Sequence, residues 1–213
     1  MHVRLIELTG LAAFIALCGM SWGALFSAGA LEAMCWTLLA LPIAFYLADI
    51  LTGMIHWVCD SFGSERTPLW GPLLVGPFRR HHRDPLAITR ISLVENLGAS
   101  AIAGSLALLF IRPAPGDHGF LWHFWMWFLV FGVVSNLFHR WAHWPRRARP
   151  RWMVALQTHR LLLSPQAHLA HHRRPHRVNY CILSGWGNAL TNRVPWERLE
   201  GWLSRLGIRT NFD

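Results

Sequence analysis

Histidine is the residue type in this chain that could carry metal chemistry, because nine of the 13 histidines fall into four short clusters. Each cluster follows an apolar stretch directly or lies one loop beyond it. Imidazole binds iron, zinc, copper and nickel, and one zinc ion takes only three or four protein ligands. Eight or nine histidines are too many for one ion, so the pattern predicts two. The clustered residues are His56, His81, His82, His139, His143, His168, His171, His172 and His176.

Two of the clusters have helical spacing. His139 and His143 are four residues apart, so a helix that continues past an apolar segment places both on one face. His168, His171 and His172 have the i, i+3 and i+4 spacing and also share one face of a helix. No single spacing of this kind is specific, because an isolated HxxxH pair is common by chance. The combination of clusters carries the prediction of a metal site.

The remaining clusters support the same interpretation. His81 and His82 are adjacent, which on a helix separates them by about 100° and suits two ions, or a ligand and a bridge. His56 ends an apolar segment. A buried polar group without a partner costs about 1–3 kcal/mol, so nine clustered rings need partners. A metal ion satisfies one nitrogen of each ring and leaves the other free to donate to a nearby acceptor. The alternative is a set of solvent-exposed histidines with no metal.

Four polar residues beside the clusters are candidate acceptors for the second ring nitrogens: Asp60, Asp84, Glu95 and Asn96. Asp49 is different, because it lies deep inside an apolar segment, where an ionisable residue is a functional candidate by default. Its carboxylate could also bond His56 or a backbone group. His159 is isolated from the clusters and is interpreted as structural or substrate-facing.

Composition places the chain in a membrane. Of its 213 residues, 53% are hydrophobic and only 15% are charged, against about 25% in ordinary soluble domains. The length predicts one domain, 1–213. The four cysteines form no CxxC pair, which argues against a disulfide framework and against a thiolate zinc site.

We expect an all-α integral membrane protein with about four transmembrane helices, because a bilayer core needs about 20 apolar residues per helix. A helical, histidine-rich cap in the cytosol, formed by 56–93 and 139–213, would hold the two-metal centre. The first segment could instead be a cleaved signal peptide, although its apolar run is longer than usual for one. The expected transmembrane helices are 5–26, 33–55, 94–111 and 121–138.

The distribution of arginine predicts which side the clusters face. All 20 basic residues are arginine, and 19 of them lie on the cytoplasmic side if the amino terminus does. Only Arg112 then lies outside, and all four histidine clusters are cytoplasmic. Arginine interleaved with tryptophan could also stack on bases. Beside four transmembrane segments, a basic surface that faces anionic lipid headgroups is the simpler interpretation, so no nucleic-acid partner is expected.

Four stretches together resemble the Kua-type lipid desaturase family, which includes plasmanylethanolamine desaturase, bacterial CarF-like proteins and a plant plastid palmitate desaturase. The last stretch is the most specific, because its histidine spacing occurs together with a PHxxxYCIxxGWxN pattern. The stretches are DILTGMIHWVCD (49–60), FRRHHRDPLAITR (78–90), FHRWAHW (138–144) and LLLSPQAHLAHHRRPHRVNYCILSGWGN (161–188).

The resemblance implies a single lipid desaturase domain with two iron ions. His176 would be a ninth ligand or would lie just outside the ligand set. One departure is visible, because many members have a histidine where this chain has Ile91. Either that histidine is not needed by the metals, or this protein has diverged in substrate or activity. Carried over residue by residue, the implied iron ligands are His56, His81, His82, His139, His143, His168, His171 and His172.

The resemblance also implies an activity, the O2-dependent desaturation of a phospholipid. The first expectation is conversion of a plasmanyl (alkyl-ether) lipid to a plasmenyl (vinyl-ether) lipid. Desaturation of an acyl chain near its carboxyl end, or hydroxylation by a similar centre, are the alternatives. Two electrons would come from a cytochrome b5-like protein or a ferredoxin. A metal sensor or transporter is less favoured, because no series of ionisable residues crosses the apolar segments.

The expected location is a bacterial inner membrane. The first apolar segment starts close to the amino terminus, which leaves no room for an organelle-targeting extension.

Overall fold

Four long apolar helices dominate the computed structural model, which describes residues 2–27, 29–114, 116–208 and 210. They are α1 (His2–Phe26), α2 (Ala30–Ser61), α5 (Leu93–Phe110) and α6 (Phe120–Ala142). Each is long and apolar enough to cross a bilayer. Within the described ranges, β-structure is limited to one isolated bridge between Phe62 and Thr210. The predicted all-α class with four transmembrane helices is therefore confirmed.

Two of these helices run further than hydropathy predicted. α2 ends at Ser61 instead of 55, and α6 ends at Ala142 instead of 138. The added turns contain polar residues, among them His56, Asp60 and His139. A hydropathy criterion stops at such residues, whereas the backbone hydrogen bonds of a helix continue through them.

The chain forms two compact units, Met1–Ala48 with Ser92–Asn136, and Asp49–Ile91 with Leu137–Asp213. The division falls inside α2 and inside α6, so each of these helices begins in the first unit and ends in the second. All four histidine clusters belong to the second unit.

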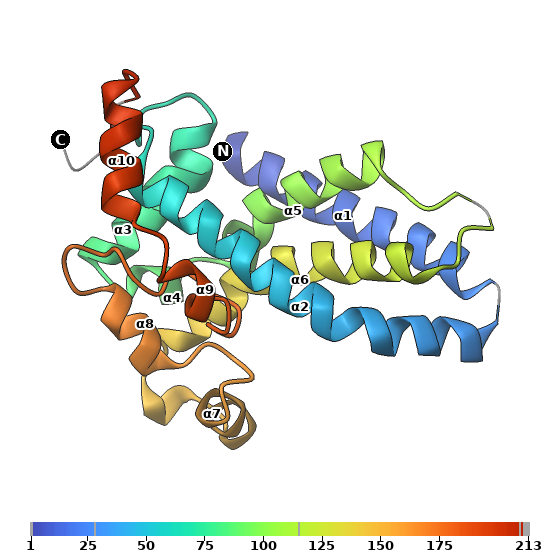
Figure 1. Cartoon of the computed structure of the whole chain (residues 1–213). Coiled ribbons are helices and arrows are strands. Elements are labelled where there is room, and N and C mark those ends of the chain that lie inside the picture. The colour runs from blue at the N-terminus through green and yellow to red at the C-terminus, as the bar shows by residue number, and fades with distance from the viewer. Residues whose placement is uncertain (1, 28, 115, 209, 211–213) are drawn as a thin grey trace. The chain divides into compact units, whose positions relative to one another are not determined.

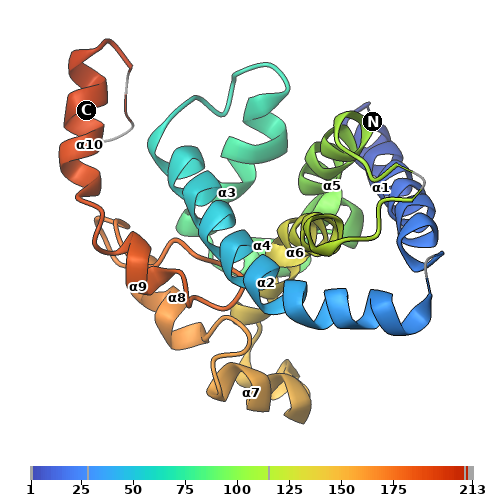
Figure 2. The ribbon, with the colours of Figure 1, turned by 45° about the vertical axis from the view of Figure 1, so that its right-hand side comes forward.

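In the first unit, α1 lies alongside α5, as Figures 1 and 2 both show. The two backbones approach closely at Gly98, where an added Cβ would overlap the side chain of Glu7. Ser105 Oγ donates to the Gly10 carbonyl oxygen at 3.1 Å across the same contact. Small residues and hydroxyl donors of this kind hold helices together in lipid, where apolar burial contributes little. Phe14 and Met126 lie in the apolar core of this unit.

The second unit adds short helices to the ends of α2 and α6. Arg79 of α3 bonds the Cys59 carbonyl oxygen, which fixes α3 against the end of α2. Ser164 caps α8, because its side chain accepts from the Ala167 N–H. The short elements are η1 (Gly71–Val75), α3 (Gly76–Arg83), α4 (Ala87–Arg90), η2 (Arg146–Ala148), α7 (Arg151–Thr158), α8 (Pro165–His171), α9 (Asn188–Thr191) and α10 (Trp196–Arg205).

A buried carboxylate ties the turn before α9 to α2. Asp49 has no exposed surface and accepts from the backbone N–H groups of Leu183 at 2.8 Å, Ser184 at 3.2 Å and Gly187 at 3.0 Å. The Ser184 hydroxyl donates to the same carboxylate at 3.1 Å. Of the two partners that the sequence left open for Asp49, the structure shows the backbone.

We expect Asp49→Ala to destabilise the protein strongly, because it leaves three buried N–H groups without an acceptor. Each such group costs about 1–3 kcal/mol, so the total loss is at least about 3 kcal/mol. Asp49→Asn keeps one acceptor oxygen and should lose less. Thermal unfolding of the purified protein in lipid nanodiscs measures both variants. An Asp49→Ala protein as stable as the wild type would contradict this role of the carboxylate.

Candidate metal centre

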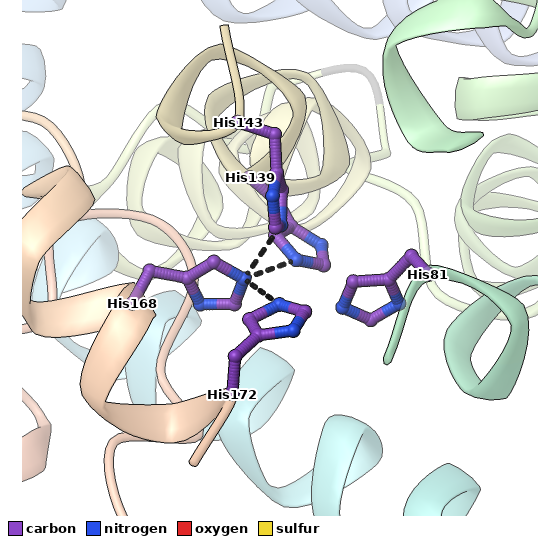
Figure 3. A group of neighbouring side chains, drawn as sticks. All are labelled: His81, His139, His143, His168 and His172. Atoms are coloured by element: carbon purple, nitrogen blue, oxygen red, sulfur yellow. Dashed lines mark hydrogen bonds between the residues drawn. The ribbon is translucent and has the colours of Figure 1, made fainter. Parts of the chain in front are cut away.

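Five histidines from three parts of the second unit direct their rings toward one point (Figure 3). Their candidate ligand nitrogens all lie within 4.8 Å of one another. His81 comes from α3, and the others come from the end of α6, from α8 and from the residue that directly follows each of these two helices. This first ligand group consists of His81, His139, His143, His168 and His172.

The ring nitrogens of this group are too crowded to be explained by hydrogen bonds. His168 Nε2 lies 2.8 Å from the Nε2 of His139, 2.9 Å from that of His143 and 3.0 Å from that of His172. A neutral imidazole nitrogen has either one hydrogen or one lone pair, so it cannot make three such bonds. Several lone pairs must therefore face one another, which is costly unless a cation lies among them.

The group fits a metal ion. Neighbouring ligands about 2.1 Å from one ion and at right angles to each other lie about 3.0 Å apart, close to the observed nitrogen–nitrogen distances. His81 Nε2 is buried and has no hydrogen-bond partner among the described residues, so it is available as a further ligand.

A second ligand group combines three histidines with a carboxylate: His56, Asp60, His82 and His171. His171 Nε2 lies 3.2 Å from His56 Nε2 and 3.3 Å from His82 Nε2. Asp60 Oδ2 lies 3.3 Å, 3.1 Å and 3.4 Å from the Nε2 atoms of His56, His82 and His171. A carboxylate in this position supplies negative charge to a bound cation.

Asp60 is the residue whose position the sequence did not anticipate. The sequence predicts that Asp60 accepts from the histidine ring nitrogen that does not bind metal, whereas its Oδ2 lies among the candidate ligand atoms of the second group. The available signal was its i, i+4 spacing from His56, which places both on one face of α2.

Backbone carbonyls orient two rings of the second group. His56 Nδ1 donates to the Tyr180 carbonyl oxygen at 3.0 Å, and His171 Nδ1 donates to that of Val178 at 2.8 Å. These bonds leave the Nε2 atoms unprotonated, as metal binding requires. Residues 178 and 180 directly precede the turn that Asp49 holds. The buried carboxylate therefore supports the segment that orients His56 and His171.

Burial keeps the rings neutral. It lowers the pKa of His143 to about 4 and that of His172 to about 2, with neighbouring imidazoles adding to the effect. The same causes hold the pKa values of His81 and His168 well below the usual range. At neutral pH these rings carry lone pairs and no positive charge, which is the state that binds a metal ion.

The other sequence-predicted residues lie outside both groups. His176 Nδ1 donates to the His171 carbonyl oxygen at 3.0 Å, and its ring centre is 4.6 Å from that of His82. Asp84 pairs with Arg90 at 2.9 Å instead of with a histidine. Ile91, where many family members have histidine, follows α4 and is partly exposed.

Two further acceptor candidates belong to the first unit. Glu95 and Asn96 lie in the first turn of α5, where the Ser92 side chain accepts from the Glu95 N–H at 3.1 Å. Their predicted role toward the histidine rings stays a prediction.

The sequence comparisons agree with this centre. Residues 45–211 match the model of the lipid desaturase domain, and this range includes both ligand groups. The chain belongs to the lipid desaturase family.

Three curated relatives give the level of similarity. The chain is 33% identical over 169 residues to mouse (Mus musculus) plasmanylethanolamine desaturase 1, with 75% of this chain and 62% of that protein covered. It is 38% identical over 170 residues to the chloroplastic fatty acid desaturase 4 of Arabidopsis thaliana, with 78% and 51% covered. It is 33% identical over 221 residues to the plasmanylethanolamine desaturase of Myxococcus xanthus, with 96% and 74% covered.

This lipid desaturase family member therefore spans about half to three quarters of the length of these relatives. No solved structure matches the chain.

The two ligand groups predict a metal content of two ions per chain. Replacing His168, which touches three other rings of the first group, should remove at least one ion, and so should replacing His171 in the second group. The exposed His159 provides the matched control and should leave both ions in place. Metal analysis of His168→Ala, His171→Ala and His159→Ala measures this. Two ions retained in both of the first variants would refute the assignment.

Asp60 and His176 should behave in opposite ways. We expect Asp60→Ala to lose metal from the second group, because it removes the anionic oxygen among the ligand atoms. We expect His176→Ala to keep two ions, because His176 belongs to neither ligand group. Metal content after dialysis against a chelator separates the two. Loss of an ion in His176→Ala would make that residue a ninth histidine ligand.

Proposed function

We propose that this protein is an O2-dependent di-iron lipid desaturase that converts plasmanyl phospholipid to plasmenyl phospholipid. The observation that carries the proposal is the pair of adjoining ligand groups, five histidines beside three histidines and a carboxylate, in a lipid desaturase domain. The ring centres of His82 and His172, one from each group, are 4.7 Å apart, so the groups share a border. Two ions held there would act as one centre.

The choice of substrate rests on the relatives. The Myxococcus xanthus protein, a plasmanylethanolamine desaturase, aligns with 96% of this chain, and the mouse protein has the same named activity. The reaction would take an alkyl-ether –CH2–CH2– unit, O2, two electrons and two protons, and give the –CH=CH– unit and two molecules of water. Bound iron supplies the activation of O2 and the removal of the two hydrogens.

The residues of the chain hold, orient and shield the centre. The Phe78 ring lies 4.8 Å from the His56 ring and the Tyr180 ring lies 5.0 Å from the His171 ring, so carbon surrounds the second group on two sides. These packed rings limit the access of water to the second group from those two sides. The carbonyls of Val178 and Tyr180 hold one proton on each of their histidine partners and keep the Nε2 atoms available.

The two electrons would come from a separate carrier, a cytochrome b5-like protein or a ferredoxin. Several exposed arginines of the second unit, including Arg146 and Arg147, suit an acidic carrier, because complementary charge speeds encounter.

The excess of arginine on one side of the four spans also supports a bacterial inner-membrane location with the histidine groups in the cytoplasm.

A second candidate is an acyl-lipid desaturase that acts near the carboxyl end of the chain. The 38% identity to Arabidopsis fatty acid desaturase 4 favours it. In both reactions the attacked methylenes lie close to the glycerol, so one centre near the membrane interface suits either substrate.

Lipid mass spectrometry tests the proposal in cells that lack plasmalogens, are supplied with alkyl-ether phospholipid and express this protein in air. We expect an acid-labile ether lipid lighter by two hydrogens, absent without oxygen and absent in His171→Ala. A known plasmanylethanolamine desaturase in the same host is the positive control. An acyl lipid lighter by two hydrogens, with no ether product, would replace the proposal with the acyl desaturase. A lipid heavier by one oxygen atom would replace it with a hydroxylase.

A further inference from the structure

A pocket of about 590 Å³ opens beside the second ligand group. Its volume lies within the range of about 300–1,000 Å³ that is usual for small-molecule sites. It reaches Asp60, His82 and His176. It is also lined by three arginines, Arg79, Arg83 and Arg174.

One face of α3 serves both the ligand group and the pocket. Arg79, His82 and Arg83 have the i, i+3 and i+4 spacing, so they share a face of this helix. The face that brings His82 to the second ligand group therefore brings two guanidinium groups beside it. Arg80, one residue away from Arg79, does not line the pocket. Arg174 reaches the same pocket from the loop after α8.

The arginines keep positive charge available to a ligand. Arg79 is held in place by the carbonyl oxygens of Phe62 at 2.7 Å and Gly63 at 3.0 Å, which orient its guanidinium without neutralising its charge. Arg83 pairs with Glu65 at 2.9 Å, but their side chains are 63% and 41% exposed. An exposed pair of this kind is weak, so a stronger anion can displace Glu65.

Phosphate is the anion that this arrangement fits best. The planar guanidinium binds phosphate oxygens through paired N–H donors, more specifically than an ammonium group does.

The expected depth of the pocket in the membrane also agrees with the phosphate of a lipid headgroup. α2 has 32 residues, which is about 48 Å, whereas the hydrocarbon core is about 30 Å thick. α2 is therefore longer than the core is thick, and its polar last turns, which contain Asp60, suit the level of the lipid headgroups.

We propose that the Arg79–Arg83–Arg174 pocket binds the phosphate of the phospholipid substrate and so places the methylenes next to the glycerol at the second ligand group. The inference rests on the proposed function, because it assigns the headgroup of the same substrate. A phosphate site in this position explains why an arginine-lined pocket adjoins the metal ligands. It also gives the enzyme a means to select lipids by the phosphate, which lies only a few bonds from the attacked carbons.

The test uses the two exposed arginines of the pocket, each with an exposed neighbour as its matched control. Arg83→Gln is compared with Arg80→Gln on the same helix, and Arg174→Gln with Arg173→Gln on the same loop. Glu65→Gln is a gain-of-function variant, because it releases Arg83 from its salt bridge. The metal content of every variant is checked first and should match the wild type.

Two readouts are combined. Isothermal titration of the iron-loaded protein with a short-chain alkyl-ether phospholipid, below its micelle concentration, measures binding without turnover. Steady-state kinetics compares KM for the phospholipid with KM for the corresponding ether diglyceride, which has the same alkyl chain but no phosphate. Inorganic phosphate is a third probe. To bypass the electron carrier, the protein is also reduced anaerobically with dithionite, freed of excess dithionite and mixed with O2 for a single turnover at varied phospholipid concentration.

We expect Arg83→Gln and Arg174→Gln each to weaken binding and to raise KM for the phospholipid about tenfold, with kcat nearly unchanged. KM for the diglyceride should not move, and the two controls should match the wild type. Glu65→Gln should lower KM for the phospholipid. Inorganic phosphate should bind much more weakly than the lipid.

Several results would overturn the proposal. The pocket arginines do not select phosphate if the wild type fails to bind the short-chain phospholipid. The same holds if the arginine variants raise KM for the phospholipid and for the diglyceride equally. A defect that disappears in the single turnover of the dithionite-reduced protein would assign the arginines to the electron carrier. A strong inorganic phosphate site, with lipid binding unchanged in the variants, would assign them to free phosphate. If no lipid is turned over, the proposed function fails, and the binding titration still decides whether a phosphate site exists.

Discussion

The structure depends on one constraint, the burial of imidazole rings whose nitrogens face one another. A neutral ring offers one donor and one acceptor, and His168 Nε2 has three other Nε2 atoms within 3.0 Å. Protonation does not relieve this crowding, because burial strongly disfavours the charged form of these rings. A cation satisfies all the lone pairs at once. The helices and the supporting turn are best understood as parts that hold such cations in place.

The support behind the rings comes from the backbone and from one carboxylate. The segment 178–187 donates four hydrogen bonds to Asp49 and supplies the two carbonyls that orient His56 and His171. A charged group deep in an apolar helix is costly, and here every bond it makes is to a turn of the second unit. This arrangement couples the position of α2 to the geometry of the second ligand group, so that folding and metal binding support each other.

Much of this could be predicted from the sequence, and the rest depends on contacts between distant residues. The four transmembrane helices follow from long apolar runs, and the His139–His143 pair follows from helical spacing. Hydropathy ended α2 and α6 too early, because their last turns contain the polar groups that form the site. The partners of Asp49 are about 135 residues further along the chain, and no local pattern shows them. Asp60 was recognised as a neighbour of the histidines, but only the folded chain brings His82 and His171 to it.

The most direct test of the two-ion centre is X-ray absorption spectroscopy at the iron edge, combined with metal analysis, on protein purified from iron-supplied cells. The account predicts two iron ions per chain, bound mainly by imidazole nitrogen with some carboxylate oxygen and no sulfur. One ion per chain, a metal other than iron, or iron bound by sulfur would contradict it.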